Sequence, residues 1–143
     1  MKRLLAVILA VLACAALGGC EKNLAEIINA EVLSEAENQL NCESDDTVGF
    51  KLTAQENTVF INAYFTEESG IVKDNFTEEY LDFNRDSFEK LAKETAEKIV
   101  ADGECYSSLK QNEIEAVTFQ INYYDYEGEI LWSGEFPVGL DDM

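Results

Sequence analysis

Residues 116–136 read AVTFQINYYDYEGEILWSGEF, and the alternation within this stretch decides the fold class. Along residues 117–123 every second side chain is large and apolar, which is the period of a half-buried β-strand. The turn-forming segment Asp-Tyr-Glu-Gly at 125–128 separates this run from a second apolar run at 130–136. The stretch therefore predicts a β-hairpin.

An earlier pair of runs shows the same period. Apolar residues alternate along residues 48–52 and again along 59–65, and the segment 54–57 joins the two runs. This pattern predicts a second hairpin. The second run also carries Phe60 and Tyr64 on its opposite face, so we expect this strand to be central or to be covered in part on both sides.

Two helices are expected beside these hairpins. Residues 23–40 carry apolar side chains on one helical face and glutamates between them. A second helix is predicted from Asp86, which fits a capping box with Glu89, to a stop at Gly103. The segment 66–85 predicts a loop with one helical turn. The two apolar stripes consist of Leu24, Ile27, Ile28, Val32, Ala36 and Leu40, and of Phe88, Leu91, Ala92, Thr95 and Ile99.

The resulting order is α-β-β-α-β-β, and the predicted fold class is α+β. An antiparallel four-stranded sheet with two helices on one face would bury both apolar stripes. This layout would also bring the ends of the two helices, with Cys42 and Cys105, to the same end of the sheet.

The N-terminus predicts export. Lys2 and Arg3 precede an uncharged apolar run at 4–17, which as a helix would extend about 21 Å. The hydrocarbon core of a bilayer is roughly 30 Å thick, so this run is too short for a comfortable membrane span.

The sequence Leu17-Gly18-Gly19-Cys20 resembles the lipobox of bacterial lipoproteins. The resemblance implies that residues 1–19 are a signal peptide and that Cys20 is lipidated with acyl chains such as palmitate. Residues 20–143 would then form one extracytoplasmic domain, anchored to the cell membrane or the outer membrane. The alternative is an ordinary secretory signal, with Cys20 kept as a structural thiol.

Charge excludes several partners. Removal of Lys2 and Arg3 from the 10 basic side chains leaves 8 against 29 acidic ones, a formal charge of −21. Such a chain lacks the basic cluster that nucleic acids or anionic headgroups require, so the lipid at Cys20 is the expected membrane attachment. An acidic surface suits a basic protein or peptide, and it also favours solubility outside the cell.

Four cysteines are present, of which Cys14 leaves with the signal peptide and Cys20 is lipidated. Cys42 and Cys105 remain, and in an oxidising compartment they predict one disulfide. Two buried free thiols are the alternative. A structural zinc site needs about four Cys or His ligands, and the chain has no histidine, so neither a metal site nor a cofactor is predicted.

In layout, the chain resembles small, functionally uncharacterised lipoproteins of Gram-positive and gut bacteria. The resemblance rests on the lipobox, a first helix, the strand ENTVFINAYF, a helix rich in Lys and Glu, and the closing hairpin TFQINYYDYEGEILWSGEF. It implies a fold and a membrane address but no activity.

Absence of histidine excludes the usual Ser-His-Asp, Cys-His and His-metal centres. A carboxylate pair remains open among the 29 acids, so a small carboxylate-based hydrolase is the alternative function. The leading hypothesis is a non-enzymatic binding or protein-interaction module. Its candidate interaction face consists of Phe60, Tyr64, Tyr124 and Leu131, on the sheet face opposite the helices. The segment 66–85 could instead cover this face.

Overall fold

The computed structural model describes residues 22–28, 30–101 and 103–142. The predicted signal peptide at 1–19 and the predicted lipidation at Cys20 lie outside these residues. None of the helices in the described part of the chain is long and apolar enough to cross a membrane.

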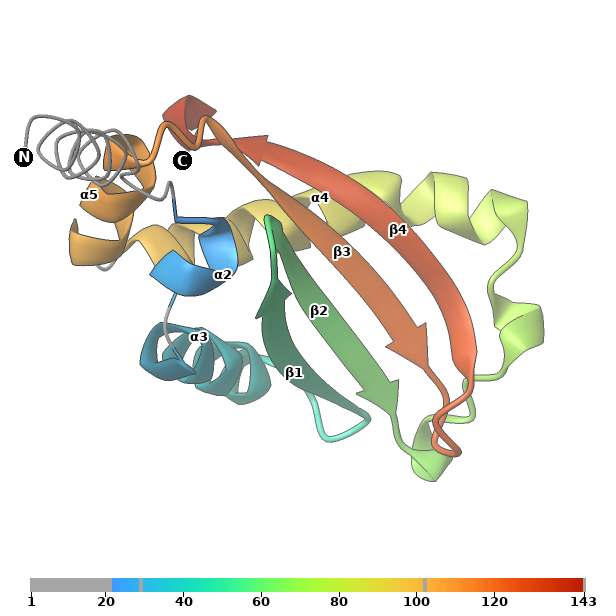
Figure 1. Ribbon diagram of the computed structural model, residues 1–143. Helices are drawn as coiled ribbons and strands as arrows, with labels where there is room; N and C mark the ends of the chain where they lie inside the picture. The colour runs from blue at the N-terminus through green and yellow to red at the C-terminus, as the bar shows by residue number, and fades with distance from the viewer. Residues whose placement is uncertain (1–21, 29, 102, 143) are drawn as a thin grey trace, which may run out of the picture.

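Four strands form one sheet in the order β1-β2-β3-β4 (Figure 1). Their bounds are β1 Val48–Gln55, β2 Thr58–Phe65, β3 Ala116–Tyr124 and β4 Ile130–Gly139. The two hairpins, β1–β2 and β3–β4, are antiparallel as predicted. The α+β class is confirmed as well.

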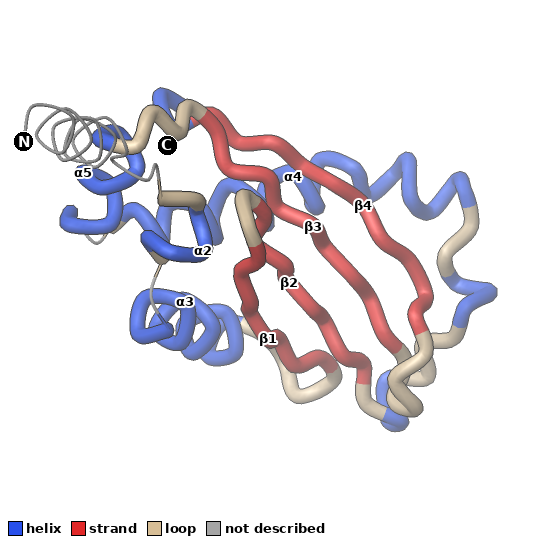
Figure 2. The backbone as a smooth tube through the Cα atoms, in the orientation of Figure 1, coloured by secondary structure: helices blue, strands red, loops and turns tan. Residues whose placement is uncertain are grey.

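The prediction of a fully antiparallel sheet was wrong, because β2 and β3 run parallel. Parallel neighbours need a crossover that returns the chain to the end of the sheet where the first strand began. Helix α4, Glu78–Val100, provides that return: its 23 residues span about 35 Å and run across one face of the sheet (Figure 2).

The helices differ from the two that the sequence predicted. The first is divided into α2, Leu24–Ile27, and α3, Ala30–Glu43, while α4 starts at Glu78 instead of Asp86. At this start, the Thr77 hydroxyl accepts a hydrogen bond from the Tyr80 amide. The expected loop at 66–85 therefore contains the short 3₁₀ helices Glu67–Ser69 and Lys73–Asn75 and the first turns of α4. A further 3₁₀ helix, Leu140–Asp142, follows β4.

Another helix, α5, Gly103–Gln111, follows α4 at the point where the sequence predicted a stop, and the sequence predicted no helix there. Its Leu109 is fully buried, together with Cys105. The order along the described chain is thus α-α-β-β-α-α-β-β.

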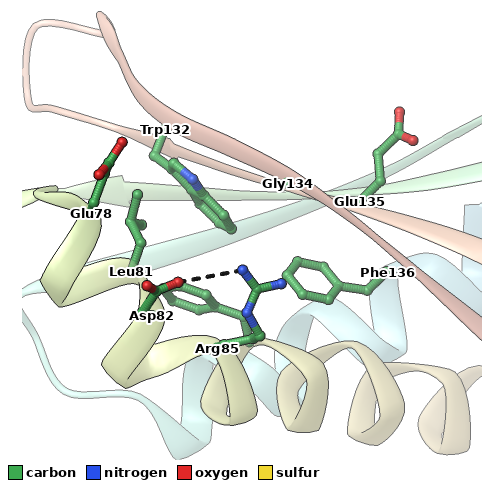
Figure 3. Close-up of a pocket in the computed structure, with 9 residues that line it drawn as sticks. Glu78, Leu81, Asp82, Arg85, Trp132, Gly134, Glu135 and Phe136 are labelled. Atoms are coloured by element: carbon green, nitrogen blue, oxygen red, sulfur yellow. Dashed lines mark hydrogen bonds and ion pairs between the residues drawn. The ribbon is translucent and has the colours of Figure 1, made fainter.

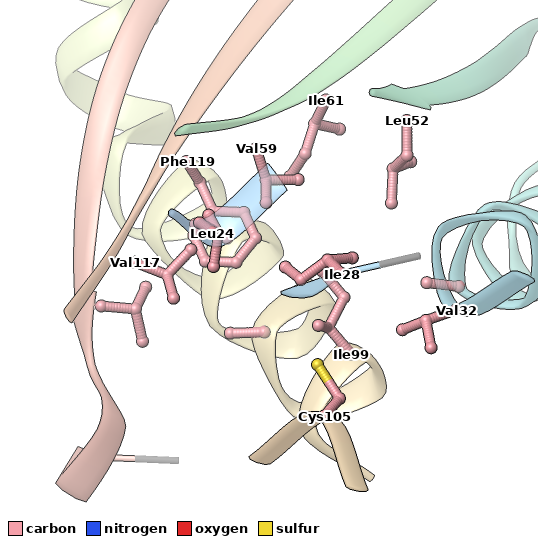
Figure 4. Packing of buried hydrophobic residues seen from close by; sticks show 14 of the residues in the cluster. Leu24, Ile28, Val32, Leu52, Val59, Ile61, Ile99, Cys105, Val117 and Phe119 are labelled. Carbon is pink, nitrogen blue, oxygen red and sulfur yellow. The ribbon is translucent and has the colours of Figure 1, made fainter. Parts of the chain in front are cut away.

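One hydrophobic cluster joins the helices to one face of the sheet (Figure 4). Val59 and Ile61 of β2 and Val117, Phe119 and Ile121 of β3 supply the sheet side of it. Most of the helix side consists of residues on the stripes that the sequence predicted, namely Leu24, Ile28, Val32, Ala36, Leu40, Phe88, Ala92 and Ile99. Ala96 of α4 and Cys105 and Leu109 of α5 complete it.

The structure does not contain the predicted disulfide between Cys42 and Cys105. Cys42 is exposed near the end of α3, whereas Cys105 is buried in the core beside Ile99 (Figure 4). The reason is α5: because Cys105 belongs to a helix and not to a loop, its side chain lies on the buried face of that helix.

Candidate functional site

The sheet face opposite the helices is open. No described helix packs on it, and Figure 1 shows the strands of this face with nothing in front of them. The alternation of each strand places Phe60, Tyr64 and Tyr124 here, as predicted. This face is therefore the surface to which the predicted interaction residues belong.

The aromatic part of the open face is a stacked pair. Tyr64 and Tyr124 lie opposite each other on β2 and β3, with ring centroids 4.8 Å apart and planes inclined by 13°. Tyr64 is 39% exposed, while Phe60 and Tyr124 are half-buried. Stacked rings lose little further freedom when a partner covers them, so the pair suits a binding surface.

Leu131 differs from the other three predicted residues because it is buried. The register of β3 and β4 shifts at this point: Tyr123 pairs with Trp132 and Tyr124 pairs with Ile130. Leu131 is the extra residue of this bulge. Although buried, Leu131 does not belong to the hydrophobic cluster between the helices and the sheet. The bulge interrupts the alternation on which the prediction for this residue relied.

A polar network lies beside the stacked tyrosines. Asn122 is only 3% exposed; its amide donates to Asn62 Oδ1 at 2.9 Å, and its Oδ1 accepts from Gln120 Nε2 at 3.0 Å. The Ser133 hydroxyl also donates to Asn122 Oδ1. This network connects β2, β3 and β4 through groups that stay neutral, so it fixes the shape of the face and offers no proton for transfer.

The segment 66–85 does not cover the open face. Its Phe76 packs against Phe65 and Tyr123, with ring centroids at 6.3 and 5.6 Å. Both of these residues alternate onto the helix-covered side of the sheet, where Tyr123 also contacts Phe88. Phe76 therefore packs at the far end of the helix-covered side, whereas Phe83 of the same segment is 86% exposed.

A second surface, which the sequence did not predict, is a groove between the first half of α4 and strand β4 (Figure 3). Its volume is about 410 Å³, and its apolar lining consists of Leu81, Phe88, Trp132 and Phe136. The Phe88 and Trp132 rings stack with centroids 4.7 Å apart.

Gly134 gives the Trp132 indole its place in the groove. A Cβ added to this glycine would lie 2.5 Å from two atoms of the indole ring and 3.2 Å from Phe136. Such a contact is far too close for real atoms, so the ring position depends on glycine here. The pattern Trp-Ser-Gly-Glu-Phe was visible in the sequence, but its meaning depends on α4 reaching this strand.

Acidic side chains border the groove. Glu78 and Asp82 project from α4, and the Arg85 guanidinium lies 3.5 Å from Asp82 Oδ1 (Figure 3). Both members of this ion pair are largely exposed, so it contributes little to stability. Tyr123 contacts two lining residues, Phe88 and Trp132, and burial raises its pKa to about 12.

Carboxylates in the described chain are all at least partly exposed to solvent. Hydrogen bonds from the side chain and the backbone of Thr47 lower the pKa of Asp45, and the bond from Lys110 lowers that of Asp141. Within residues 22–28, 30–101 and 103–142, no group of three or more His, Cys, Asp or Glu residues is placed to hold a metal ion.

No family model and no curated protein matches the chain. Two solved structures resemble it at low similarity. The pilotin EpsS of the Vibrio vulnificus type 2 secretion system is 11% identical, with 76% of this chain and 93% of that chain covered and a TM-score of 0.32. The type II secretion system pilotin AspS of Vibrio cholerae is 12% identical, with 79% and 93% covered and a TM-score of 0.30. At these TM-scores the likeness carries no argument about function.

Proposed function

We propose that this protein is a lipid-anchored, extracytoplasmic interaction module, without enzymatic activity, that binds a basic protein or peptide on the open face of its sheet. The observation that carries the proposal is the uncovered Tyr64–Tyr124 stack beside a fully hydrogen-bonded polar network. Rigid aromatic rings next to satisfied polar groups are typical of protein-binding surfaces.

Charge supports a basic partner. The formal charge of the whole chain is −19, and its pI is about 4.1. Complementary charge accelerates encounter and selects among partners, while aromatic contacts at the centre of an interface slow dissociation. The two contributions respond differently to salt and to mutation, so they can be measured separately.

The proposed anchor lies close to the folded part. The amide of Lys22, two residues after Cys20, donates to Asn112 Oδ1 at 2.9 Å, and the amide of Leu24 donates to Asn57 Oδ1 at 3.0 Å. These bonds fix the start of the described chain to the helix and hairpin beside it. A lipid on Cys20 would therefore hold the binding face near the membrane surface.

The test uses a basic partner isolated by pull-down and the double variant Tyr64→Ala, Tyr124→Ala. We expect a faster dissociation rate, steep weakening of binding with salt, and a melting temperature close to that of the unaltered protein. The variant Tyr126→Ala, which removes a tyrosine that is 55% exposed in the β3–β4 turn, is the control. A partner whose affinity changes neither with the salt concentration nor with the double tyrosine substitution would contradict the proposal.

Cys20→Ala tests the anchor. The variant should lose labelling by a fatty-acid analogue and membrane retention, while its domain stays folded, because the residue precedes the packed core. Continued acylation of this variant would contradict the lipoprotein assignment.

A further inference from the structure

One edge of the sheet, β1, is closed by side chains of α3 and of Ser44, the residue that follows it. Asn41 accepts from the Phe50 amide at 2.7 Å and donates to the Phe50 carbonyl at 2.9 Å. Glu37 accepts from the Leu52 amide at 2.8 Å, and the Ser44 hydroxyl donates to the Val48 carbonyl at 3.3 Å. Outward backbone groups of Val48, Phe50 and Leu52 therefore have partners within the molecule.

The other edge, β4, has no such cover among the described residues. The Leu140 amide donates to the Glu115 carbonyl across the β3–β4 pairing. Pairs that exchange hydrogen bonds alternate along an antiparallel ladder, so the backbone groups of Ser133, Glu135 and Pro137 point away from β3. Proline has no N–H to donate, and its position on this outward set agrees with the assignment.

No described side chain or loop supplies a hydrogen bond to these outward groups. Ser133 and Glu135 thus present two N–H donors and two C=O acceptors, and Pro137 presents one further C=O. Such an edge is a template for pairing with another strand. In Figure 1, the first turns of α4 extend past the edge of the sheet that β4 forms.

The groove follows this edge. The hollow of Figure 3 adjoins a second one of about 500 Å³, and the two share Arg85, Glu135 and Phe136. Side chains along an extended peptide point alternately to the two sides of the strand, so every second side chain of an added strand would face α4 and the Trp132–Phe136 lining. The unpaired β4 edge and the aromatic groove therefore lie side by side, so one extended segment could pair with the edge and place side chains in the groove.

Charge selects the occupant. The two hollows together are lined by five carboxylate residues and two cationic ones. A second copy of this chain would be a poor occupant, because antiparallel pairing of two β4 edges centred on Glu135 would oppose like charges, and each chain is strongly acidic. A lysine- or arginine-rich strand has the complementary charge. The carboxylate residues are Glu78, Asp82, Glu89, Glu135 and Asp142, and the cationic ones are Arg85 and Lys93.

We propose that the β4 edge binds an extended, lysine- or arginine-rich segment of another protein by strand addition. The backbone of Ser133 and Glu135 pairs with this segment, and alternate side chains of the segment enter the groove between α4 and β4. The Ser133 side chain also belongs to the polar network of the open face, but the Tyr64–Tyr124 pair lies on β2 and β3, so different variants test the two proposals.

Arg85 makes it possible to test whether the bound segment is basic or anionic. Its guanidinium lies in the groove beside Asp82, where it neutralises part of the negative charge. Arg85→Ala should therefore tighten the binding of a basic segment several-fold, whereas an anionic segment held by Arg85 would bind more weakly.

The chain has a single tryptophan, and it lies in the groove, so its fluorescence reports occupancy. The probe is a synthetic peptide of alternating lysine and valine, about eight residues long. We expect a saturable change in Trp132 fluorescence that weakens with salt. The same peptide with alternate backbone amides N-methylated, which cannot pair along one edge, should bind at least about tenfold more weakly.

Asp82→Lys in the groove should weaken binding at least about fivefold, while Glu97→Lys, an exposed position near the other end of α4, makes the same change in net charge and serves as the matched control. The Tyr64→Ala, Tyr124→Ala variant should bind this peptide like the unaltered protein. Equal binding of the methylated peptide, equal effects of the two lysine substitutions, or weaker binding by Arg85→Ala would each overturn the proposal. So would preference for a glutamate–valine peptide.

Discussion

The two outer strands of the sheet end in different ways. Along β1, Asn41 and Glu37 of α3 replace the neighbouring strand that the sheet lacks. Along β4, an aromatic groove separates the strand from α4. Among described residues, the outward backbone groups of Ser133 and Glu135 have no hydrogen-bond partner from outside the sheet. A closed edge contributes to the stability of the fold, whereas an edge beside a groove is available for recognition.

The largest effect on stability is expected from a variant that removes the side chains closing the β1 edge. Glu37→Ala with Asn41→Ala removes the hydrogen bonds to Phe50 and Leu52 and should lower the free energy of unfolding by about 3 kcal/mol. Chemical denaturation measures the loss. The control, Glu35→Ala with Asn38→Ala, alters exposed positions of the same helix and should change stability by less than about 0.5 kcal/mol. Equal losses in the two variants would show that the β1 edge is not held by these side chains.

A second test compares the glycines of the two edge strands. Gly134→Ala places a Cβ 2.5 Å from the Trp132 ring, so the indole must move, and we expect a loss of about 2 kcal/mol with a changed tryptophan spectrum. Gly49→Ala on β1 meets only Asn41 Oδ1 at 4.0 Å and should be tolerated. If both substitutions are neutral, the groove is not built around the glycine.

The sequence predicted the strands better than their arrangement. Period-two alternation located both hairpins and placed Phe60, Tyr64 and Tyr124 on one face, because alternation depends only on the strand itself. The parallel pairing of β2 with β3 depends on where the crossover returns. The first turns of α4 extend past the sheet, and none of residues 78–85 is buried, so this segment shows no apolar stripe from which a helix could be predicted.

The contacts of α3 with the β1 edge could not be predicted from the sequence, because they too depend on how the elements are arranged. Glu37 and Asn41 lie among other polar residues on α3, and their sequence does not distinguish a side chain that caps a strand from one that faces water. The Cys42–Cys105 disulfide was predicted because these two cysteines remain in the exported chain and because both were expected at helix ends, at the same end of the sheet. In α5 only Cys105 and Leu109 are buried, which is too short a pattern to reveal a helix.

A third test uses pH to examine the aromatic residues that lie next to the β4 edge. Tyr123 pairs with Trp132, and burial raises its pKa from 10.0 to about 12. Above pH 10 the unfolded chain loses this proton while the folded chain retains it, so stability falls as the pH rises from 10 to about 12. The ring is half-buried, and we expect a loss of roughly 1 to 2 kcal/mol across this window.

Thermal unfolding at several pH values measures this loss, and Tyr123→Phe should flatten the profile, because phenylalanine has no proton to lose. Tyr126→Phe, on the exposed turn between β3 and β4, should leave the profile unchanged. Identical profiles for the Tyr123 variant and the unaltered protein would place the ionising group elsewhere.

The smallest expected effect on stability concerns Pro137, which removes one donor from the outward set of β4. Pro137→Ala supplies that N–H and gives the unfolded chain more freedom, so the free energy of unfolding should fall by less than about 1 kcal/mol. The longer donor row should nevertheless strengthen pairing with the lysine–valine peptide, as measured by Trp132 fluorescence. Val138→Ala, whose backbone belongs to the set bonded to β3, should not strengthen it. If both variants bind the peptide alike, the outward assignment of Pro137, and with it the difference between the two edges, is wrong.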